Sequence, residues 1–430
     1  MRKRLTVLTV GCKANFADSA SIVREAVSAG FEIVPGARPA DVVVINTCTV
    51  THRADRDCRA LVRRARRENP GASILLTGCF AQIHPDAKAK LPEVDHWAGV
   101  VDAASLGPVL RKIAGDAHEG SRGMSEFAAS LLLGHRRTFL KIQDGCDFNC
   151  SYCVVPLARG NSRSRSEKDI IKAAVAAESD GARELVLTGI HVGLYGADRG
   201  ESEGLARLVS VLLAETGQVR IRLSSVEPME ITDALVDVIA AHPRVCRHLH
   251  IPMQSGSDRT LERMRRPYGA RRYAAVVGNV AAGIHGVHVG ADVIAGFPGE
   301  TDADFEETVR VLDGLPVHYL HVFPYSPRPG TESAGWRDDV AASVKKERVS
   351  RLLRLDGEKR KGYLQAQVGK ELEVLVESAD RDRGEVSGTS GNYVEVRFPG
   401  EGREIGELAR VRAESVRGKG LYGNREVRNV

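Results

Sequence analysis

Hydrophobic and polar positions in the first hundred residues follow two periods in alternation. Three apolar runs, LTVLTV, DVVVIN and SILLTG, are typical of buried strands. Segments with helical spacing separate them, including one with Ile22, Val23, Ala26 and Val27 on one face and a later one rich in arginine. Continuous apolar strands joined by helices predict a parallel sheet with helices on both faces.

A second series of strand-like runs begins near Phe139. The runs are FLKI, ELVLTG, RIRLSS, HLHIPM, VGADVIAG and HYLHVF. Helical segments such as LARLVSVLLAE, ITDALVDVIAA and DFEETVRVLDGL separate several of them. Six units of this kind predict a partial or full barrel of parallel strands.

Near the end of the chain the spacing of apolar residues changes to strict alternation. Apolar residues alternate in KELEVLVES and in YVEVRF, and glycine-rich turns lie between these runs, which predicts a small all-β domain. A charged helical segment, KKERVSRLLRLDGEKRKGYLQ, precedes it. Residues 101–136 show weaker periodicity and are expected to form a linker or irregular connection. The predicted fold class is α/β with a small β-domain at its end.

Composition narrows the class of protein. Of 430 residues 43% are hydrophobic and 27% charged, which is typical of a protein that buries a core. The sequence has no apolar run near the roughly 18 residues that a membrane-spanning helix needs, and its start does not resemble a signal peptide, so we expect a cytoplasmic protein without membrane contact. The net charge of +5 is compatible with an anionic partner.

Three of the eight cysteines lie together in GCDFNCSYC, at Cys146, Cys150 and Cys153. Three thiolates on one short loop can hold three irons of a [4Fe–4S] cluster, whereas a cluster that only transfers electrons normally has four cysteine ligands. The fourth iron is then open to another ligand. Structural zinc is the alternative, but it usually takes ligand pairs from two loops, and the sequence has no second pair at zinc spacing.

Cys12, Cys48 and Cys79 each follow an apolar run, in LTVLTVGC, VVVINTC and SILLTGC. Loops at the carboxyl ends of parallel strands meet at one edge of a sheet, so these cysteines are expected to form a second open cluster site. Three buried apolar-like cysteines are the alternative. Cys58 and Cys246 have no partner at ligand spacing and are interpreted as ordinary thiols.

The spacing of Cys146, Cys150 and Cys153 resembles that of the radical S-adenosylmethionine (SAM) superfamily, and the whole pattern resembles its methylthiotransferases. The resemblance implies an N-terminal domain with an auxiliary cluster, a radical SAM partial (β/α)6 barrel and a C-terminal barrel of the RNA-binding TRAM type, which is OB-like. The expected limits are 3–100, then a linker at 101–135, then 136–365 and 366–430.

The resemblance also assigns site residues. Cys12, Cys48 and Cys79 would bind the auxiliary cluster, and Cys146, Cys150 and Cys153 the cluster that binds SAM. The positions that match SAM contacts in the family are Tyr152, Thr188, Gly189, Ser224, Glu227, Gln254, Ile294 and Gly296. Simpler roles stay open for three of them: Gly189 and Gly296 as turn glycines and Ser224 as a helix N-cap.

The implied activity is a methylthio transfer that uses SAM and two [4Fe–4S] clusters. The strings GCKAN and NTCTVTHRAD resemble the branch that modifies C2 of N6-threonylcarbamoyladenosine at position 37 of tRNA. Isopentenyladenosine 37 of tRNA and an aspartate of a ribosomal protein are alternative substrates, and a non-catalytic iron-sulfur redox or sensing protein is an alternative function. Expected partners are a tRNA anticodon stem-loop and an electron donor such as flavodoxin or ferredoxin, with the enzyme a monomer.

Candidate RNA contacts fall in three places. Two are basic: a helix with arginines at 53, 56, 59, 63, 64, 66 and 67, and the trio Arg159, Arg163 and Arg165. A solvated helix face is the alternative for such charge runs. In the C-terminal domain Tyr393 and Tyr422 are possible stacking residues, with ordinary barrel packing favoured for Tyr393.

Overall fold

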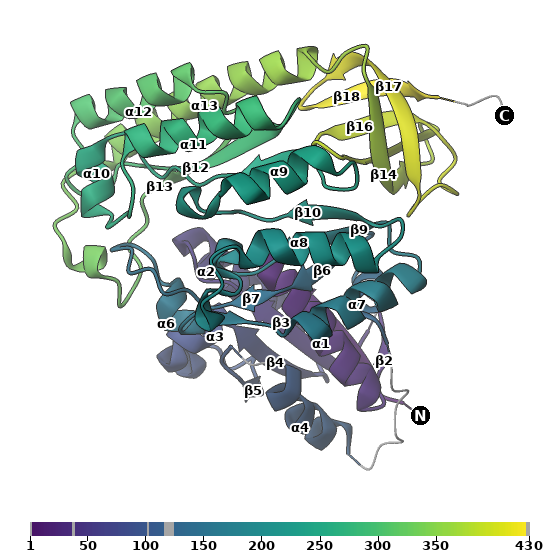
Figure 1. Ribbon diagram of the computed structural model, residues 1–430. Coiled ribbons are helices and arrows are strands. Elements are labelled where there is room, and N and C mark those ends of the chain that lie inside the picture. The colour runs from purple at the N-terminus through teal and green to yellow at the C-terminus, as the bar shows by residue number, and fades with distance from the viewer. Residues whose placement is uncertain (1, 37–38, 101–102, 116–123, 427–430) are drawn as a thin grey trace. The chain divides into compact units, whose positions relative to one another are not determined.

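The computed structural model describes residues 2–36, 39–100, 103–115 and 124–426 of the chain (Figure 1). It divides into two compact units. Unit 1 comprises residues 1–181, 187–190 and 326–334, and unit 2 comprises residues 182–186, 191–325 and 335–430. Among the described residues, no helix is both long enough and apolar enough to cross a membrane.

Unit 1 contains a five-stranded sheet in the order β2-β1-β3-β4-β5, and all its neighbouring strands are parallel. The strands are β1 (Arg4–Thr9), β2 (Glu32–Ile33), β3 (Val42–Thr47), β4 (Ser73–Gly78) and β5 (His96–Trp97). All six residues of β3 are buried, because helices cover both faces of the sheet. The predicted parallel sheet is confirmed.

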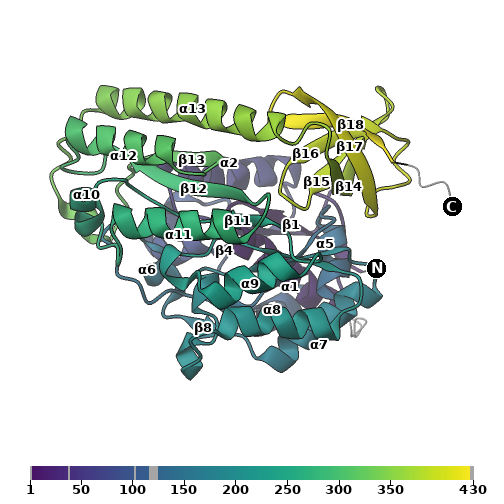
Figure 2. The same cartoon turned by 45° about the horizontal axis from the view of Figure 1, so that its top comes forward.

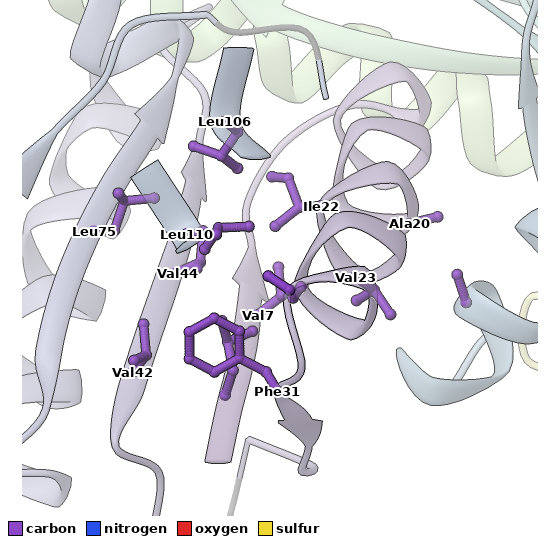
Figure 3. Packing of buried hydrophobic residues seen from close by; sticks show 14 residues of the cluster. Val7, Ala20, Ile22, Val23, Phe31, Val42, Val44, Leu75, Leu106 and Leu110 are labelled. Atoms are coloured by element: carbon purple, nitrogen blue, oxygen red, sulfur yellow. The ribbon is translucent and has the colours of Figure 1, made fainter. Parts of the chain in front are cut away.

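One face of this sheet packs against α1 (Lys13–Ser28), α4 (Ala103–Ala114) and α5 (Glu126–Leu132). Figure 3 shows Ile22 of α1 and Leu106 of α4 in the same cluster as Val7 and Val44 of the strands. The other face packs against α2 (His52–Glu68) and α3 (Cys79–Ile83) in a second cluster that contains Phe80. These two apolar layers fix the carboxyl ends of the strands, where three of the cysteines lie.

The segment predicted as an irregular linker contains α4 and α5 within its described part. That prediction is wrong for these residues: Leu106, Leu110 and Ala129 are fully buried in the first cluster. Pro108 lies inside α4 and weakens its helical signature in the sequence, since proline removes a backbone hydrogen bond. Residues 101–102 and 116–123 lie outside the described residues.

The rest of unit 1 includes the elements next to Cys146, Cys150 and Cys153. Its further elements are η1 (Pro85–Lys90), β6 (Thr138–Lys141), β7 (Gln143–Asp144), α6 (Val155–Arg159), β8 (Arg163–Ser164), α7 (Glu167–Ser179) and the start of η5 (Glu332–Gly335). Strand β9 (Glu184–Thr188) begins in unit 2 and ends in unit 1. Within unit 1, the Ile142 N–H donates to the carbonyl of Thr188 at 2.9 Å, so the end of β9 is held beside the cysteine loop.

Unit 2 holds most of the second strand series. Its strands are β10 (Arg220–Leu223), β11 (His248–His250), β12 (His288–Ala295) and β13 (Tyr319–Pro324), and β11, β12 and β13 pair in parallel. Its helices in this region are η2 (Val192–Leu194), η3 (Ala197–Arg199), α8 (Gly204–Glu215), η4 (Pro228–Glu230), α9 (Asp233–Ala241), α10 (Asp258–Arg263), α11 (Ala270–Gly283) and α12 (Asp302–Gly314). Parallel bridges Ile221–Val245 and Ser225–His250 join the segments around β10 and β11. Each of the six predicted runs is therefore a strand.

Helix α13 (Ala342–Gln365) packs along β13 and leads into a closed five-stranded barrel (Figure 2). The barrel order is β14-β15-β16-β18-β17. Its strands are β14 (Glu371–Asp380), β15 (Glu385–Ser390), β16 (Glu395–Pro399), β17 (Leu408–Arg417) and β18 (Gly420–Arg425). The predicted α/β class with a small terminal β-barrel is confirmed.

Two buried arginines of β10 connect the parallel strands of unit 2 to this barrel. Arg220 and Arg222 both pair with Glu184, at 2.6 and 2.8 Å. Arg222 also donates to the carbonyls of Ser390 and Gly391, at 2.9 and 3.1 Å. The paired charges and the carbonyls satisfy groups that would otherwise be costly to bury.

Replacing Arg222 with methionine is expected to lower the free energy of unfolding by about 3–5 kcal/mol, because Glu184 loses one of its two charge partners in a buried site. Urea denaturation followed by circular dichroism measures the change. Arg403, whose partner Glu401 is as exposed as itself, is the matched control, and Arg403→Met should change stability little. Equal effects of the two substitutions would contradict a structural role for Arg222.

Candidate active site

Cys12, Cys48 and Cys79 lie directly beyond the carboxyl ends of β1, β3 and β4, at one edge of the sheet. Their thiols interact electrostatically. The pKa of Cys48 is raised to about 12, chiefly by burial, with Cys12 and Cys79 as further causes. The pKa of Cys79 is also raised by burial, and Cys12 adds to the shift. The structure therefore brings the three predicted residues into one group.

Two glycines allow this close approach. Gly11 has φ +127°, and a Cβ there would lie 2.7 Å from the Cβ of Cys48. Gly78 has φ +93°, and a Cβ there would lie 2.5 Å from the carbonyl oxygen of Thr47. Both conformations favour glycine, and any side chain would push the loops apart. Gly11 and Gly78, which each precede a cysteine, thus let the ends of β1 and β4 lie close to the loop of Cys48.

Asn15 of α1 braces the same loops. Its side-chain amide donates to the carbonyls of Val10 and Thr47, at 2.8 and 2.9 Å. One carbonyl precedes Cys12 and the other precedes Cys48, so a single buried side chain ties two of the cysteine loops together.

Cys146, Cys150 and Cys153 lie on the loop between β7 and α6. The loop is held by its backbone: the Cys146 N–H donates to the carbonyl of Gly160 at 3.0 Å, and the Cys153 N–H to that of Cys150 at 3.0 Å. The N–H of Phe148 points at the sulfur of Cys146, 3.4 Å away. Tyr152 is half-buried on the same loop. These backbone hydrogen bonds hold the loop in a fixed fold. Its three thiols come from eight consecutive residues, Cys146 to Cys153.

Arg159, at the end of α6, connects the two trios. Its side chain is almost fully buried and donates to Asn15 at 2.7 Å and to Asp18 at 2.8 Å, both on the helix that follows Cys12. Its positive charge also opposes the effect of burial on the pKa of the Cys79 thiol. Helix α6 packs against α3, which begins at Cys79. The two cysteine trios of unit 1 are therefore neighbours.

Lys141 and Asp144 complete this charge network. Arg159 donates to Asp144 at 3.0 Å, and Lys141 lies 2.5 Å from Asp18 and 2.9 Å from Asp144. Burial opposes ionisation of Asp144, but Arg159 and Lys141 lower its pKa to about 2. The two cations and two carboxylates compensate each other and leave the guanidinium available to a neighbouring sulfur.

A short segment of unit 1, residues 326–334, supports the loop after Cys48. Arg328 is buried and donates to Thr49 at 2.7 Å and to Asp55 at 2.5 Å. Thr49 in turn donates to Asp55 at 2.6 Å. Because Thr49 directly follows Cys48, this cluster fixes the direction in which the cysteine leaves β3.

Comparison with known proteins agrees with this geometry. The family model described as uncharacterized protein family UPF0004 matches residues 4–99, and that of the Radical SAM superfamily matches residues 140–312. The threonylcarbamoyladenosine tRNA methylthiotransferase MtaB of Bacillus subtilis (strain 168) is 37% identical over 417 residues, which cover 94% of this chain and 92% of the relative. The protein of the same name from Aquifex aeolicus (strain VF5) is 36% identical over 94% of this chain and 98% of its own length. The chain belongs to the radical SAM methylthiotransferases, in the MtaB branch.

A second group of relatives carries another name. The tRNA-2-methylthio-N(6)-dimethylallyladenosine synthase of Moorella thermoacetica (strain ATCC 39073 / JCM 9320) is 33% identical and covers 96% of both chains. Among solved structures, the radical S-adenosylmethionine methyltransferase TsrM from Kitasatospora setae, with cobalamin and a [4Fe–4S] cluster bound, aligns with a TM-score of 0.55 at 14% identity. It covers 76% of this chain and 77% of TsrM, a likeness that shows the fold alone.

The cofactors of this methylthiotransferase are SAM and [4Fe–4S] clusters. The donor sets fit them. Each trio offers three sulfur ligands, which leaves one iron of a four-iron cluster for a non-protein ligand.

Three of the expected SAM contacts lie in unit 1: Tyr152, on the cysteine loop, Thr188 and Gly189. Thr188 ends β9, and its buried hydroxyl has no hydrogen-bond partner among the described residues. At Gly189 a Cβ would lie 2.7 Å from the carbonyl oxygen of Gln143, so close packing against the cysteine loop explains this glycine. The unpartnered hydroxyl fits a polar ligand, since buried polar groups are normally paired.

The other expected contacts lie in unit 2. Ser224 follows β10, and its buried hydroxyl likewise has no partner in the described part of the chain. It does not cap a helix, because the next one, η4, begins at Pro228. Burial raises the pKa of the Glu227 carboxyl, which is paired with Arg266.

Three more of these residues surround the end of β12. Gln254 is buried and has φ +65°, an uncommon backbone conformation for a residue other than glycine. Ile294 is half-buried in β12. Gly296 has φ +75° and its N–H donates to Glu300 at 2.7 Å, so the turn alone accounts for this glycine.

Most of the predicted RNA-contacting arginines have structural partners. Arg66 donates to the carbonyls of Ala72 and Glu93 and to Asp95, each at 2.7 Å. Arg165 pairs with Glu126 at 2.8 Å, and Arg159 belongs to the network between the trios. Arg56 and Arg67 are exposed on α2. The basic helix is thus partly a structural element and partly a solvated face.

Sequence reasoning missed the role of Arg159 and its partners. The sequence predicts Arg159 as a candidate RNA contact and does not single out Asn15 or Asp18. The signal is a polar residue three positions after Cys12 and an arginine six positions after Cys153, both on helices that follow cysteines. Their pairing across more than 140 residues requires the fold.

Proposed function

We propose that this protein adds a methylthio group to C2 of N6-threonylcarbamoyladenosine at position 37 of tRNA. The observation that supports the proposal is the charge network of Arg159, which links α6, after Cys153, to α1, after Cys12, within unit 1. Transfer from one site to a substrate activated at the other requires such proximity, because a reactive intermediate must meet its partner before a quencher does.

The two trios take different roles in this proposal. Cys146, Cys150 and Cys153 hold the cluster that binds SAM, and Cys12, Cys48 and Cys79 hold the auxiliary cluster. When bound, SAM and the clusters supply a methyl group, a 5′-deoxyadenosyl radical and the sulfur to be transferred. The proposed SAM contacts of unit 1 are Tyr152, Thr188 and Gly189. Those of unit 2 are Ser224, Glu227, Gln254, Ile294 and Gly296.

The protein's own part is to hold ligands and charges. Asn15 and Arg328 fix the loops that carry Cys12 and Cys48. Arg159 places a positive charge beside Cys79, which stabilises the thiolate form that binds iron. The apolar layers on both faces of the sheet keep this edge from shifting as ligands exchange.

The choice of threonylcarbamoyladenosine rests on the MtaB relatives and on the strings around Cys12 and Cys48. Relatives named for dimethylallyladenosine are similar over as much of the chain, so that base is the second candidate. Expression of the protein in a strain that lacks its own threonylcarbamoyladenosine methylthiotransferase tests the choice. Mass analysis of tRNA nucleosides should show the methylthio derivative of threonylcarbamoyladenosine restored.

Other results of that experiment reject the proposal. A methylthio group on isopentenyladenosine alone would assign the protein to the second candidate. Unmodified tRNA together with a methylthio-aspartate in a ribosomal protein would indicate the protein substrate, and absence of SAM cleavage would indicate a redox or sensing protein.

The C-terminal barrel is proposed to contact the anticodon stem-loop. A groove on it is lined by Arg383, Arg397, Arg417 and Lys419 with Glu385 and Glu395. Arg417 lies 3.6 Å above the ring of Tyr422, which is half-buried. Cations near an accessible ring suit a nucleic-acid strand, which offers phosphates and bases together. Tyr393, by contrast, stacks on His248 with 4.3 Å between ring centroids, so it packs inside unit 2.

The double variant Arg417→Gln/Lys419→Gln is expected to weaken tRNA binding about tenfold and to reduce the salt dependence of binding by about two counterions. Filter binding at several salt concentrations measures both. The control is Arg410→Gln/Arg412→Gln, which also removes two positive charges from the barrel. These two arginines lie on β17 and pair with Glu371 and Glu426. If both pairs weaken binding alike, net charge rather than the groove explains the affinity.

We further propose that the domain limits are 3–100, 136–365 and 366–430, where 427–430 lie outside the described residues. The enzyme would act as a cytoplasmic monomer that receives electrons from flavodoxin or ferredoxin.

A further inference from the structure

Three adjacent strands of unit 2 bring two histidines and an aspartate together. His250 ends β11, Asp292 lies in β12, and His321 lies in β13. Asp292 is the direct neighbour of His321 in the register of β12 and β13. Of all groups of three His, Cys, Asp or Glu in the described residues, this one alone has ligand atoms that all lie within 4.8 Å of one another.

Both histidines face the same carboxylate oxygen. Nε2 of His250 and Nδ1 of His321 each lie 3.2 Å from Oδ1 of Asp292. The two rings are stacked, with 5.0 Å between centroids. One oxygen and two ring nitrogens thus converge on a single point.

Hydrogen bonding alone leaves this arrangement incomplete. His250 is 5% exposed, and its Nε2 has no hydrogen-bond partner in the described part of the chain despite its nearness to Asp292. Buried polar nitrogens are normally paired, so this unpartnered Nε2 points to a ligand that the described residues do not supply.

The neighbouring residues prepare His250 as a ligand. The hydroxyl of Ser225 lies 2.8 Å from its Nδ1 and occupies that nitrogen, so Nε2 is turned toward Asp292. A hydrogen bond to the second ring nitrogen is the usual way in which proteins orient a metal-binding histidine.

We propose that His250, Asp292 and His321 bind one divalent transition-metal ion of the zinc type. Two imidazole nitrogens and one carboxylate oxygen are a common zinc ligand set, and three protein ligands leave a fourth position for water or an anionic oxygen of a ligand. His321 is half-exposed, so the fourth position is open to solvent from that side. The site differs from the sulfur sites in chemistry, since none of its ligands is a thiolate.

The same ligand set also suits ferrous iron in other proteins. Zinc is chosen as the probe because it has no redox chemistry and can be counted separately from cluster iron. The inference does not depend on the substrate of the methylthio transfer, and its failure would leave that assignment untouched.

The test uses the full chain with both clusters reconstituted, so that the cysteine sites are filled. After equilibrium dialysis against Zn²⁺, elemental analysis should find about one zinc per chain with cluster iron unchanged. Asp292→Asn and His321→Ala should each weaken zinc binding at least tenfold, and Ser225→Ala should weaken it about tenfold by releasing His250. The matched control is His285→Ala, an exposed histidine of the same unit, which should bind zinc as the parent protein does.

The variants also separate binding from folding. His321 is half-exposed and its loss should leave the circular dichroism spectrum unchanged, so a lower zinc content then reports the lost ligand. Zinc should raise the melting temperature of the parent protein and of His285→Ala but not of His321→Ala. Equal zinc uptake by the parent, Asp292→Asn and His321→Ala, or no uptake by the parent, would overturn the proposal.

Discussion

Replacing Cys150 with alanine is expected to abolish 5′-deoxyadenosine formation, with a loss of more than about 10³-fold, because two thiolates do not retain a four-iron cluster that needs three. Iron content should fall from about eight to about four atoms per chain, since the ligands Cys12, Cys48 and Cys79 are untouched. Anaerobic reconstitution, iron analysis and chromatography of the nucleoside products measure both quantities. Methylthio transfer should be lost with the radical.

Cys246→Ala is the matched control for this substitution. Cys246 is buried like Cys150 and lies in unit 2 beside Arg222. Its loss should leave iron content and product formation as in the parent protein. Persistent 5′-deoxyadenosine in Cys150→Ala, at a rate near that of Cys246→Ala, would show that the radical site has been placed on the wrong cysteines.

The strand ends could be predicted from the sequence because local patterns define them. The apolar runs before Cys12, Cys48 and Cys79 are continuous, and parallel strands with covered faces align their carboxyl ends. That reasoning was enough to place three distant cysteines at one edge. It did not require any knowledge of which helices cover the sheet.

Features that depend on long-range pairing could not be predicted in this way. Leu106 and Leu110 belong to a helix whose pattern Pro108 obscures, and only their packing against the sheet reveals it. The sequence predicts an RNA contact or a solvated position for Arg159. Its bonds to Asn15 and Asp18 depend on the fold. His250, Asp292 and His321 carry no spacing motif, since each comes from a different strand and they converge only through strand register.

The substitution Cys48→Ala is expected to separate two steps that Cys150→Ala stops together. Cys48 is the central member of its trio, on the middle strand of the sheet, and its loss should empty the auxiliary site. Methylthio transfer should fall below detection, by more than about 10³-fold, whereas 5′-deoxyadenosine should still form because Cys146, Cys150 and Cys153 keep their cluster. Iron should again fall to about four atoms per chain.

Cys58 offers a close control for this change, because its thiol donates to the carbonyl of Cys48 at 3.3 Å and is fully buried. Burial raises the pKa of Cys58 to about 12, as it does that of Cys48, so the two thiols differ chiefly in their place relative to Cys12 and Cys79. Cys58→Ala should lower stability modestly through a small cavity and keep about eight irons and the transfer activity. Transfer that survives in Cys48→Ala, or that is lost equally in Cys58→Ala, would mean that packing at this edge of the sheet, and not a sulfur ligand, is what the reaction requires of Cys48.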